Sequence, residues 1–478
     1  MINDLVQAIN GVLWGESIVI FGVGIPLLIP MLVFAGIWFT VKLGFVQIRH
    51  FGYMFSVMKG STSTDSKGHG ISSFQALCTS LSARVGTGNL AGVAVAISLG
   101  GAGSIFWMWV IAILGMATGF AESVLGQLYK VKDENGEYRG GPAYYIKQGI
   151  NKTWLAVAFS LCLFLGYGFI FSAVQANTIT DALSHAYDIP TTYSGLAIIT
   201  LAGLIVVGGM HRIAQFAEWI VPFMAVGYIL VTLGVTIANI EQIPALIWHI
   251  ISSAFGLEEA TGGAVGAAIK NGIQRGLYSN EAGSGSVPHA AAAASPNPNH
   301  PVSQGYVQML GVFFDTVVLC TCTAVIILLA GGSQSEQMEG IRLTQDAMSH
   351  HLGGNGIDFI AAAISLFAFT SVVANYAYGE SNLHIFKLDN KVGRIAYTIG
   401  YLAMIFWGSR AALPQVWAAA DMALGMMTVI NIIAIIWMTP TIVSISHHYF
   451  EQRKKGQIPS YKPGECDIQG ESEKGIWD

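Results

Sequence analysis

The stretch SLSARVGTGNLAG, residues 80–92, lies between QALCT and VAVAISLGG in a mostly apolar part of the chain. Its three glycines, together with Arg84, Thr87 and Asn89, are unexpected in a hydrophobic helix. A helix that is interrupted inside a membrane leaves backbone N–H and C=O groups without partners, which costs roughly several kcal/mol per group. Such an interruption persists only where something binds those groups, so this stretch predicts a binding site.

The chain around this stretch has the composition of a membrane protein. Of its 478 residues, 53% are hydrophobic and only 11% are charged, whereas soluble domains average about 25% charged residues. This composition predicts an all-α polytopic membrane protein. The net charge of −5 comes without a basic region, so no nucleic-acid partner is expected. The five cysteines have neither metal-ligand spacing nor a disulfide pattern, and no cofactor is expected.

About eleven apolar segments approach the roughly 20 residues that a membrane-spanning helix needs. The expected spans are Ile18–Val41, Ile71–Leu99, Ile105–Leu128, Trp154–Ile179, Tyr193–Val207, Ala214–Ile237, Gly262–Ala294, Val307–Ala330, Ile357–Tyr378, Ile395–Phe406 and Val416–Ile445. The N-terminal sequence MINDLVQAIN has no basic residue, so we expect a retained first helix rather than a cleaved signal peptide. The segment Ile243–Phe255 is too short to span and predicts an interfacial helix.

The basic residues predict the orientation of these spans, because cytoplasmic segments are rich in Lys and Arg. With the N-terminus outside, we assign 20 of the 23 basic residues to inner segments, Lys270 and Arg275 among them. The outer loops then hold only Arg342 and Arg410, and Arg84 lies inside the interrupted span. We therefore expect the N-terminus outside and the C-terminus in the cytoplasm.

A second interrupted span contains NGIQRGLYSNEAGSGSVPHA, residues 271–290. The interrupted spans are the second and the seventh, so they cross the membrane in opposite directions. Interrupted helices at corresponding positions of two inverted repeats indicate a transporter's binding site. We expect a LeuT-type fold of 5+5 inverted repeats with one extra N-terminal helix. The expected segments are 1–70 for that helix and a cytoplasmic loop, 71–210 and 211–240 for the first repeat, 241–450 for the second, and 451–478 for a disordered cytoplasmic tail.

The interruption suits a zwitterion and a cation. Free N–H groups at the start of the outer half-helix favour a carboxylate, and free C=O groups at the end of the inner half-helix favour sodium. Gly86 and Gly88 allow a close backbone approach, and Thr87 and Asn89 add polar side chains. The alternative for one such stretch is close helix packing through glycine. A dinucleotide fingerprint is rejected, because it requires a preceding strand in a βαβ unit.

Several longer motifs resemble the alanine/glycine:cation symporter (sodium:alanine symporter) family. They are GFVQIRHF, FQALCTSLSARVGTGNLAGVA, GGAGSIFWMWV, GMATGFAE, RGGPAYYI, FSAVQANTI, LYSNEAGSGSVPHAAAAA and FAFTSVVANYAYGE. The resemblance extends from about Leu13 to Tyr449. It implies a LeuT fold that carries alanine, glycine or related amino acids with sodium across the inner membrane of a prokaryote.

The resemblance also implies site residues. The substrate would be held by Thr87, Gly88, Asn89, Gln175, Ser371 and Asn375. Sodium would be held by carbonyl groups of Ser82, Val85 and Phe367 and by the hydroxyl groups of Thr370 and Ser371. The alternatives are that Gln175 only bonds a neighbouring helix and that the two hydroxyls only bond carbonyls of their own helix.

Two positions depart from the family pattern as we expect it. Asn375 stands where many members have Trp, which suggests a larger or more polar pocket. Arg84 stands where many members have Thr. Because a charge inside a span is costly, we expect Arg84 to form a gate or ion pair with Glu281 first and Glu122 second. For Glu122 a structural ion pair is the favoured interpretation.

Together these features predict a secondary active symporter that imports small neutral amino acids with sodium by alternating access. The favoured substrates are alanine, D-alanine and glycine. The alternatives are a glutamine or broader neutral amino acid symporter, and proton-coupled transport. An enzyme is not expected, since the histidines form no nucleophile–base or metal constellation. A passive channel is disfavoured by the two interrupted helices around one site. The expected partners are an amino acid, sodium and the lipid bilayer, and no pattern indicates an oligomeric state.

Overall fold

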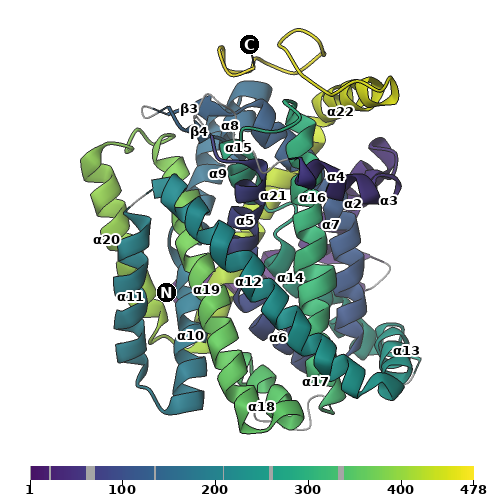
Figure 1. Ribbon diagram of the computed structural model, residues 1–478, viewed down its shortest axis with the longest axis vertical. Helices are drawn as coiled ribbons and strands as arrows, with labels where there is room; N and C mark the ends of the chain where they lie inside the picture. Colours follow the sequence, from purple (N-terminus) through teal and green to yellow (C-terminus); the bar gives the residue numbers. More distant parts are fainter. Residues whose placement is uncertain are drawn as a thin grey trace.

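The computed structural model describes residues 2–20, 23–60, 70–133, 136–207, 209–257, 262–331 and 339–477. Long helices run side by side between two faces of a single bundle (Figure 1). Six helical segments are long and apolar enough to cross a membrane: Gly103–Leu128, Thr153–Tyr187, Gly209–Ala238, Pro301–Leu329, Gly354–Leu383 and Leu413–Trp437. Shorter apolar helices accompany them, and the chain is a multi-pass helical membrane protein.

The α-helices in chain order are α1 (Ile2–Leu13), α2 (Leu28–Lys42), α3 (Val46–Arg49), α4 (Phe51–Lys59), α5 (Ser73–Arg84), α6 (Val93–Gly100), α7 (Gly103–Leu128), α8 (Pro142–Tyr145), α9 (Thr153–Leu165), α10 (Phe171–Tyr187), α11 (Thr191–Val206), α12 (Gly209–Ala238), α13 (Ile243–Ala254), α14 (Gly262–Asn280), α15 (Val287–Ala293), α16 (Pro301–Val312), α17 (Thr321–Leu329), α18 (Ile341–Leu352), α19 (Gly354–Leu383), α20 (Lys391–Gly408), α21 (Leu413–Trp437) and α22 (Thr439–Lys454). Five short helices join some of them: the π-helices η1 (Gly88–Gly92), η2 (Ile146–Ile150), η3 (Gly166–Ile170) and η5 (Phe313–Cys320), and the 3-10 helix η4 (Ile240–Gln242). Two antiparallel hairpins pair β1 (Ile18–Ile20) with β2 (Val23–Ile25) and β3 (Val131–Lys132) with β4 (Tyr138–Arg139).

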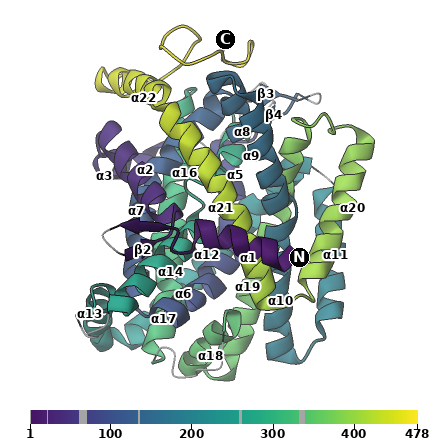
Figure 2. The same ribbon diagram turned by 180° about the vertical axis from the view of Figure 1, so that it is seen from behind.

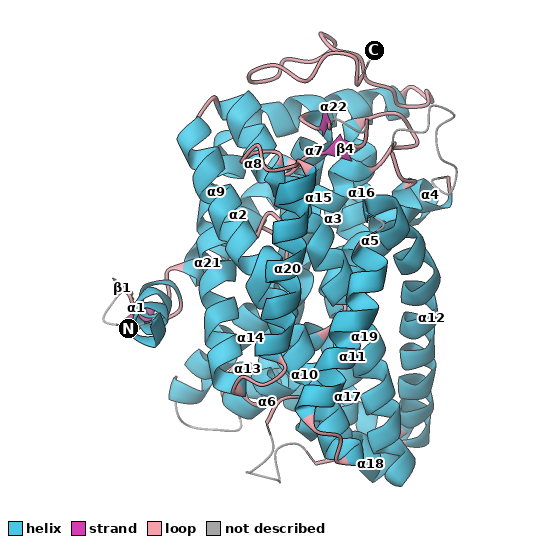
Figure 3. Cartoon of the chain, turned by 90° about the vertical axis from the view of Figure 1, so that its left-hand side faces the viewer, coloured by secondary structure: helices cyan, strands magenta, loops and turns pink. Residues whose placement is uncertain are grey.

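The expected first span, Ile18–Val41, is wrong as a continuous helix. Its first part is the β1–β2 hairpin, and α2 begins only at Leu28. The β-branched residues of this segment favour strands, and a hydropathy window counts them as it counts helix formers. The preceding helix α1 lies across α21, as Figures 2 and 3 show, and Asn10 Nδ2 and Trp14 Nε1 donate to the carbonyl groups of Ala418 (2.8 Å) and Asp421 (3.1 Å).

The last expected span, Val416–Ile445, also differs. Helix α21 ends at Trp437, and a separate helix, α22, begins at Thr439 with Pro440 in its first turn. Proline lacks the N–H that a continuing helix would need and suits the first turn of a new one. The remaining expected spans correspond to helical segments, although α10 continues to Tyr187, beyond the expected Ile179, and α13 (Ile243–Ala254) is the short helix expected over Ile243–Phe255.

The C-terminal tail differs from the disordered segment that we expected. Its described residues, up to Trp477, form no regular helix after α22, yet Tyr461 and Trp477 are only 1% and 2% exposed. Trp477 Nε1 donates to the carbonyl of Leu128 at 3.4 Å, and the ammonium of Lys130 lies 4.8 Å from the Trp477 ring centroid. Trp477 therefore anchors this polar segment at the end of α7, and Tyr461 packs against Trp477 with ring centroids 5.7 Å apart.

Helix α7 lies at the centre of the bundle. It packs against α14 and α15, which carry the second interruption, and also against α16 and α2. Helix α5 packs against α12 and α19. Helix α14 packs against α6 and α15 packs against α5, so the two interrupted helices, α5–α6 and α14–α15, meet inside the bundle.

Candidate functional site

The first interruption lies where the sequence predicts it. Helix α5 ends at Arg84, Val85 is extended (φ −75°, ψ 91°), and helical structure resumes at η1. The Gly86 N–H donates to Asn89 Oδ1 at 3.0 Å, and the Thr87 N–H donates to Gln175 Oε1 at 2.9 Å. Side-chain oxygens therefore occupy the free amides that we assigned to a ligand.

Glycine is required at position 86 for close approach. A Cβ there would overlap the Ser371 hydroxyl on one side and Gln175 Oε1 on the other. The backbone at Gly86 therefore lies close to both a predicted sodium ligand and a predicted substrate ligand.

The second interruption is a tight loop between α14 and α15. Glu281, Gly283 and Gly285 have positive φ angles of 58°, 90° and 85°, a region that favours glycine. Glu122 of α7 accepts hydrogen bonds from the N–H groups of Gly283 (3.1 Å) and Gly285 (3.2 Å) and from Asn431 Nδ2 (2.7 Å). Among the described residues Glu122 forms no ion pair, in contrast to the role we favoured for it: its carboxylate satisfies the free amides of this loop.

The five predicted sodium ligands lie together between α5 and α19. Ser371 Oγ lies 2.8 Å from the carbonyl oxygen of Ser82, 3.3 Å from that of Val85 and 3.1 Å from that of Phe367. Thr370 Oγ1 donates to the Phe367 carbonyl at 2.8 Å. All five residues are at most 1% exposed. Hard cations prefer oxygen ligands, and all five groups here are carbonyl or hydroxyl oxygens, so this donor set fits sodium. The alternative that the two hydroxyls bond only carbonyls of their own helix agrees with Thr370. It does not agree with Ser371, whose hydroxyl also lies within hydrogen-bond distance of the Ser82 and Val85 carbonyls.

Some of the predicted substrate residues lie near one small cavity, whereas the side chain of Asn89 points away from it. Thr87 and Gln175 are in direct contact, since Thr87 Oγ1 also donates to Gln175 Oε1 at 2.8 Å. Asn375 of α19 and Gln175 line one cavity of about 10 Å³, and Asn375 Oδ1 has no hydrogen-bond partner within the described residues. Asn89 Nδ2 instead points to Ser279 and Asp315, away from that cavity. This conformation leaves room in the cavity for about one water molecule.

Arg84 lines the same cavity and is only 2% exposed. Its Nη1 lies 3.5 Å from the Gln308 carbonyl, whereas Nε and Nη2 have no hydrogen-bond partner among the described residues. The structure does not bring Arg84 within ion-pairing distance of Glu281 or Glu122. Glu281 also lines the cavity and accepts a hydrogen bond from Ser286 Oγ at 2.6 Å.

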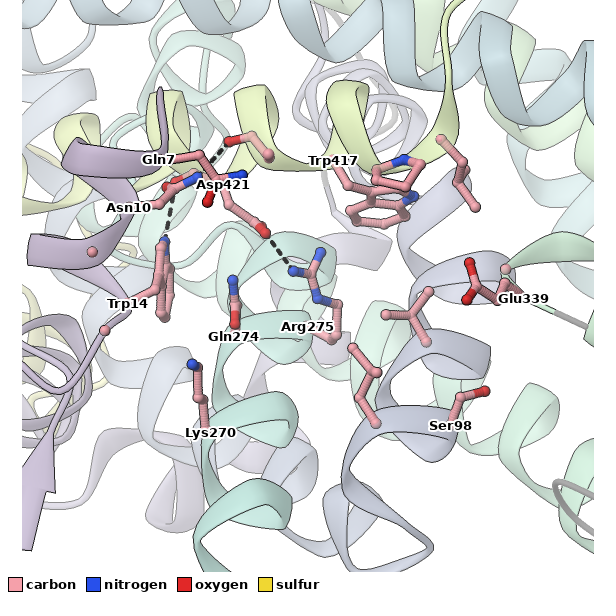
Figure 4. Close-up of a pocket in the computed structure, with 18 residues that line it drawn as sticks. Gln7, Asn10, Trp14, Ser98, Lys270, Gln274, Arg275, Glu339, Trp417 and Asp421 are labelled. Atoms are coloured by element: carbon pink, nitrogen blue, oxygen red, sulfur yellow. Dashed lines mark hydrogen bonds and ion pairs between the residues drawn. The ribbon is translucent and has the colours of Figure 1, made fainter. Parts of the chain in front are cut away.

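Sequence reasoning missed a larger pocket of about 510 Å³ between α1, α6, α14 and α21 (Figure 4). At its base Arg275 Nη2 pairs with Asp421 Oδ2 at 2.6 Å, and the Arg275 guanidinium lies 4.6 Å from the Trp417 ring centroid. Trp417 packs on Tyr278, with ring centroids 4.8 Å apart, and Tyr278 lines the smaller cavity. These four side chains therefore separate the two cavities. The isolated charges of Arg275 and Asp421 inside apolar segments were the only sequence signal for this pair, but no spacing rule connects two residues so far apart in the chain.

This pocket also corrects the assignment of two basic residues. Lys270 and Arg275 line it together with Gln7, Glu339 and Leu413, which the predicted topology places outside. Lys270 and Arg275 therefore belong with the outer segments in that topology, which leaves 18 of the 23 basic residues on the inner side. Lys67, which the prediction also counts there, lies outside the described residues.

Residues 1–463 match the sodium:alanine symporter family. The amino-acid carrier protein AlsT of Bacillus subtilis is 45% identical over 432 residues, which cover 90% of this chain and 91% of AlsT. The "Probable sodium/glutamine symporter GlnT" of the same organism is 43% identical, with 96% and 93% covered. The sodium/alanine symporter AgcS of Methanococcus maripaludis is 36% identical, with 94% and 98% covered.

Proposed function

Because the chain belongs to the sodium:alanine symporter family, we propose that it imports alanine, D-alanine and glycine with sodium by alternating access. Sodium-coupled amino acid transport is common to the family. What we propose for this chain is that its substrates are small neutral amino acids. The observation that carries it is the convergence of three carbonyls and the Ser371 hydroxyl beside the Thr87 N–H of the first interruption, which Gln175 Oε1 now accepts. A glutamine substrate is the second candidate, supported by the similarity to GlnT and by the polar side chain of Asn375.

We also propose a LeuT-type 5+5 arrangement, with residues 71–240 and 241–450 as inverted repeats. Its support is the pair of interrupted helices, α5–α6 and α14–α15, that meet inside the bundle. The predominance of basic residues in one set of loops supports an outer N-terminus and a cytoplasmic C-terminus in a prokaryotic inner membrane.

Sodium would bind the carbonyl oxygens of Ser82, Val85 and Phe367 and the hydroxyls of Thr370 and Ser371. These ligands belong to α5 and α19, so a bound cation would hold the two helices together. Their relative position would then depend on sodium, which is the requirement for coupling.

The substrate carboxylate would replace Gln175 Oε1 at the Thr87 N–H. Both are oxygen acceptors, and the start of a helix attracts negative charge. Gln175 would then be free to turn toward the amino group or side chain of the substrate, with Asn375 on the facing helix. The Arg275–Asp421 pair and Trp417 would close this site toward the larger pocket.

Uptake of a radiolabelled panel into proteoliposomes tests the function. The panel contains L-alanine, D-alanine, glycine and glutamine, with an inward sodium gradient. We expect alanine and glycine to accumulate with sodium and not with choline in its place. Accumulation driven by a proton gradient in sodium-free vesicles would contradict sodium coupling, and uptake of glutamine alone would favour the second candidate.

Replacing Thr370 with alanine should raise the sodium concentration for half-maximal transport about fivefold, since one lost ligand corresponds to about 1 kcal/mol. Affinity for alanine at saturating sodium should change less. Thr232→Ala on α12 is the matched control, because that buried hydroxyl also donates to its own helix, at 3.0 Å from the Tyr228 carbonyl. Equal sodium dependence in the two variants would remove Thr370 from the sodium site.

A gate pair between Arg84 and Glu281 would form in a conformation other than the present one. Both side chains line the small cavity, and the Arg84 guanidinium has two nitrogens without partners in the described residues. Arg84→Ala should impair transport, and adding Glu281→Ala should cause little further loss, because the pair acts as a unit. Initial uptake rates of the parent, both single variants and the double variant measure this coupling. Strictly additive losses would show that the two residues act independently.

A further inference from the structure

An apolar groove of about 830 Å³ lies beside α20, apart from the cavities described above. Helix α20 lies at the edge of the bundle (Figure 1). The apolar side chains that line the groove come from α9, η3, α19 and α20, and they are Phe164, Phe169, Leu383, Val392, Ala396 and Tyr397. Val392 is 77% exposed, so the groove opens on the outer flank of the bundle. In a multi-pass membrane protein this flank contacts lipid.

The mouth of the groove lies at one end of the bundle. Asn390 and Lys391 line it at the start of α20, and Leu383 lines it at the end of α19. From Lys391 to Tyr397 the helix advances about 9 Å, at about 1.5 Å per residue. One leaflet of a bilayer contains about 15 Å of hydrocarbon. The groove therefore covers the depth of the first part of an acyl chain whose head group lies at the mouth.

The mouth carries a positive charge without a partner. Lys391 forms no ion pair in the part of the chain that the structure describes. The acids near it are already paired: Asp389 with His384 at 2.9 Å, and Glu380 with Arg394 at 3.3 Å. Basic pockets between membrane helices on the cytoplasmic side bind anionic lipid head groups, and a phosphate would supply the partner that Lys391 lacks.

We propose that this groove binds an anionic phospholipid, with its phosphate at Lys391 and one acyl chain between α9 and α20. In the proposed orientation the mouth lies at the cytoplasmic surface, so the lipid comes from the inner leaflet. A second copy of the chain fits less well. Around a twofold axis it would bring its own Lys391 to the same surface, since such an interface uses the same patch on both subunits.

Tyr397 connects the groove to the helix that carries the proposed substrate residue Asn375. Its hydroxyl donates to the Tyr376 carbonyl at 3.1 Å, and the two rings stack with centroids 4.9 Å apart. Tyr376 directly follows Asn375 on α19. An acyl chain packed against Tyr397 therefore supports this part of α19.

The test is native mass spectrometry of the full-length chain in detergent, with dioleoylphosphatidylglycerol or dioleoylphosphatidylcholine added. The parent should retain the anionic lipid more strongly than the zwitterionic one. Lys391→Gln should weaken binding of the anionic lipid about fivefold, as expected for one lysine near an anionic surface, and leave the zwitterionic lipid unchanged. Lys454→Gln is the matched control, because this exposed lysine lies on α22, across the bundle from α20 (Figure 1).

A second variant fills the groove itself. Ala396→Trp should weaken retention of the anionic lipid about tenfold or more, since it excludes about two CH₂ groups of the acyl chain. Ile399→Trp is its control, because Ile399 is 65% exposed on the same helix and does not line the groove. This variant should retain the lipid as the parent does.

Equal retention of the two lipids by the parent overturns the proposal, and so does parental retention in both Lys391→Gln and Ala396→Trp. A dimer without retained lipid that dissociates in Ala396→Trp overturns it as well, since a second copy would then fill the groove. If Ala396→Trp does not fold, Lys391→Gln decides alone. Binding is measured without sodium or amino acid, so a failure of the proposed function leaves this result unchanged.

Discussion

Replacing Gly86 with alanine is expected to reduce sodium-driven uptake at least about fivefold, because overpacking of a tight contact costs about 1–3 kcal/mol. The added methyl group would overlap the Ser371 hydroxyl and Gln175 Oε1. It would separate α5 from α19, where the proposed sodium ligands meet, and displace the acceptor at the Thr87 N–H. Initial uptake rates, normalised to the reconstituted amount of protein, measure the effect.

Gly92→Ala is the matched control for this variant. A Cβ at position 92 would lie 3.6 Å from Trp417 and 3.7 Å from the Thr87 carbonyl, which are ordinary contacts. Gly92→Ala should therefore keep most of the parental rate. If the two variants transport equally well, close passage of the backbone at Gly86 is not needed, and the assigned site is wrong.

Replacing Glu122 with leucine is expected to destabilise the folded protein by about 2–6 kcal/mol, since each buried donor left without an acceptor costs about 1–3 kcal/mol. The N–H groups of Gly283 and Gly285 would both lose their acceptor. Those two glycines form the loop between α14 and α15, so the second interruption would lose its support. The measurement is the fraction of protein that remains monodisperse in detergent after heating.

Glu122→Gln separates hydrogen bonding from charge in this experiment. The amide keeps one oxygen acceptor, but its nitrogen would face the N–H that the other carboxylate oxygen now accepts, so only part of the stability should return. If the leucine variant is as stable as the parent, the loop does not depend on Glu122. If both variants are equally unstable, the loop needs both carboxylate oxygens of Glu122.

The sequence predicts the parts of this fold that depend on local chemistry. Glycine and polar residues inside apolar segments identify both interruptions, and hydropathy identifies most of the long helices. The meeting of Ser82, Val85, Phe367 and Ser371 followed from the family resemblance, since spacing alone cannot bring α5 and α19 together.

Other features depend on tertiary contacts that no local pattern encodes. The β1–β2 hairpin has the hydropathy of a span, and the packed tail has the composition of a disordered segment. The direction of the Asn89 side chain depends on Asp315, which is 226 residues away in the chain. The pairing of Arg275 with Asp421 depends likewise on the packing of α14 near α21.

The N-terminal helix α1 offers a way to follow the motion of α21. Its hydrogen bonds to the Ala418 and Asp421 carbonyls attach it to the helix turn that holds Arg275, so α1 and α21 should move as one rigid body. Leu5 is 60% exposed on α1. A spin label at Leu5 would therefore report the movement of α21 by spectroscopy without a substitution in any long apolar helix.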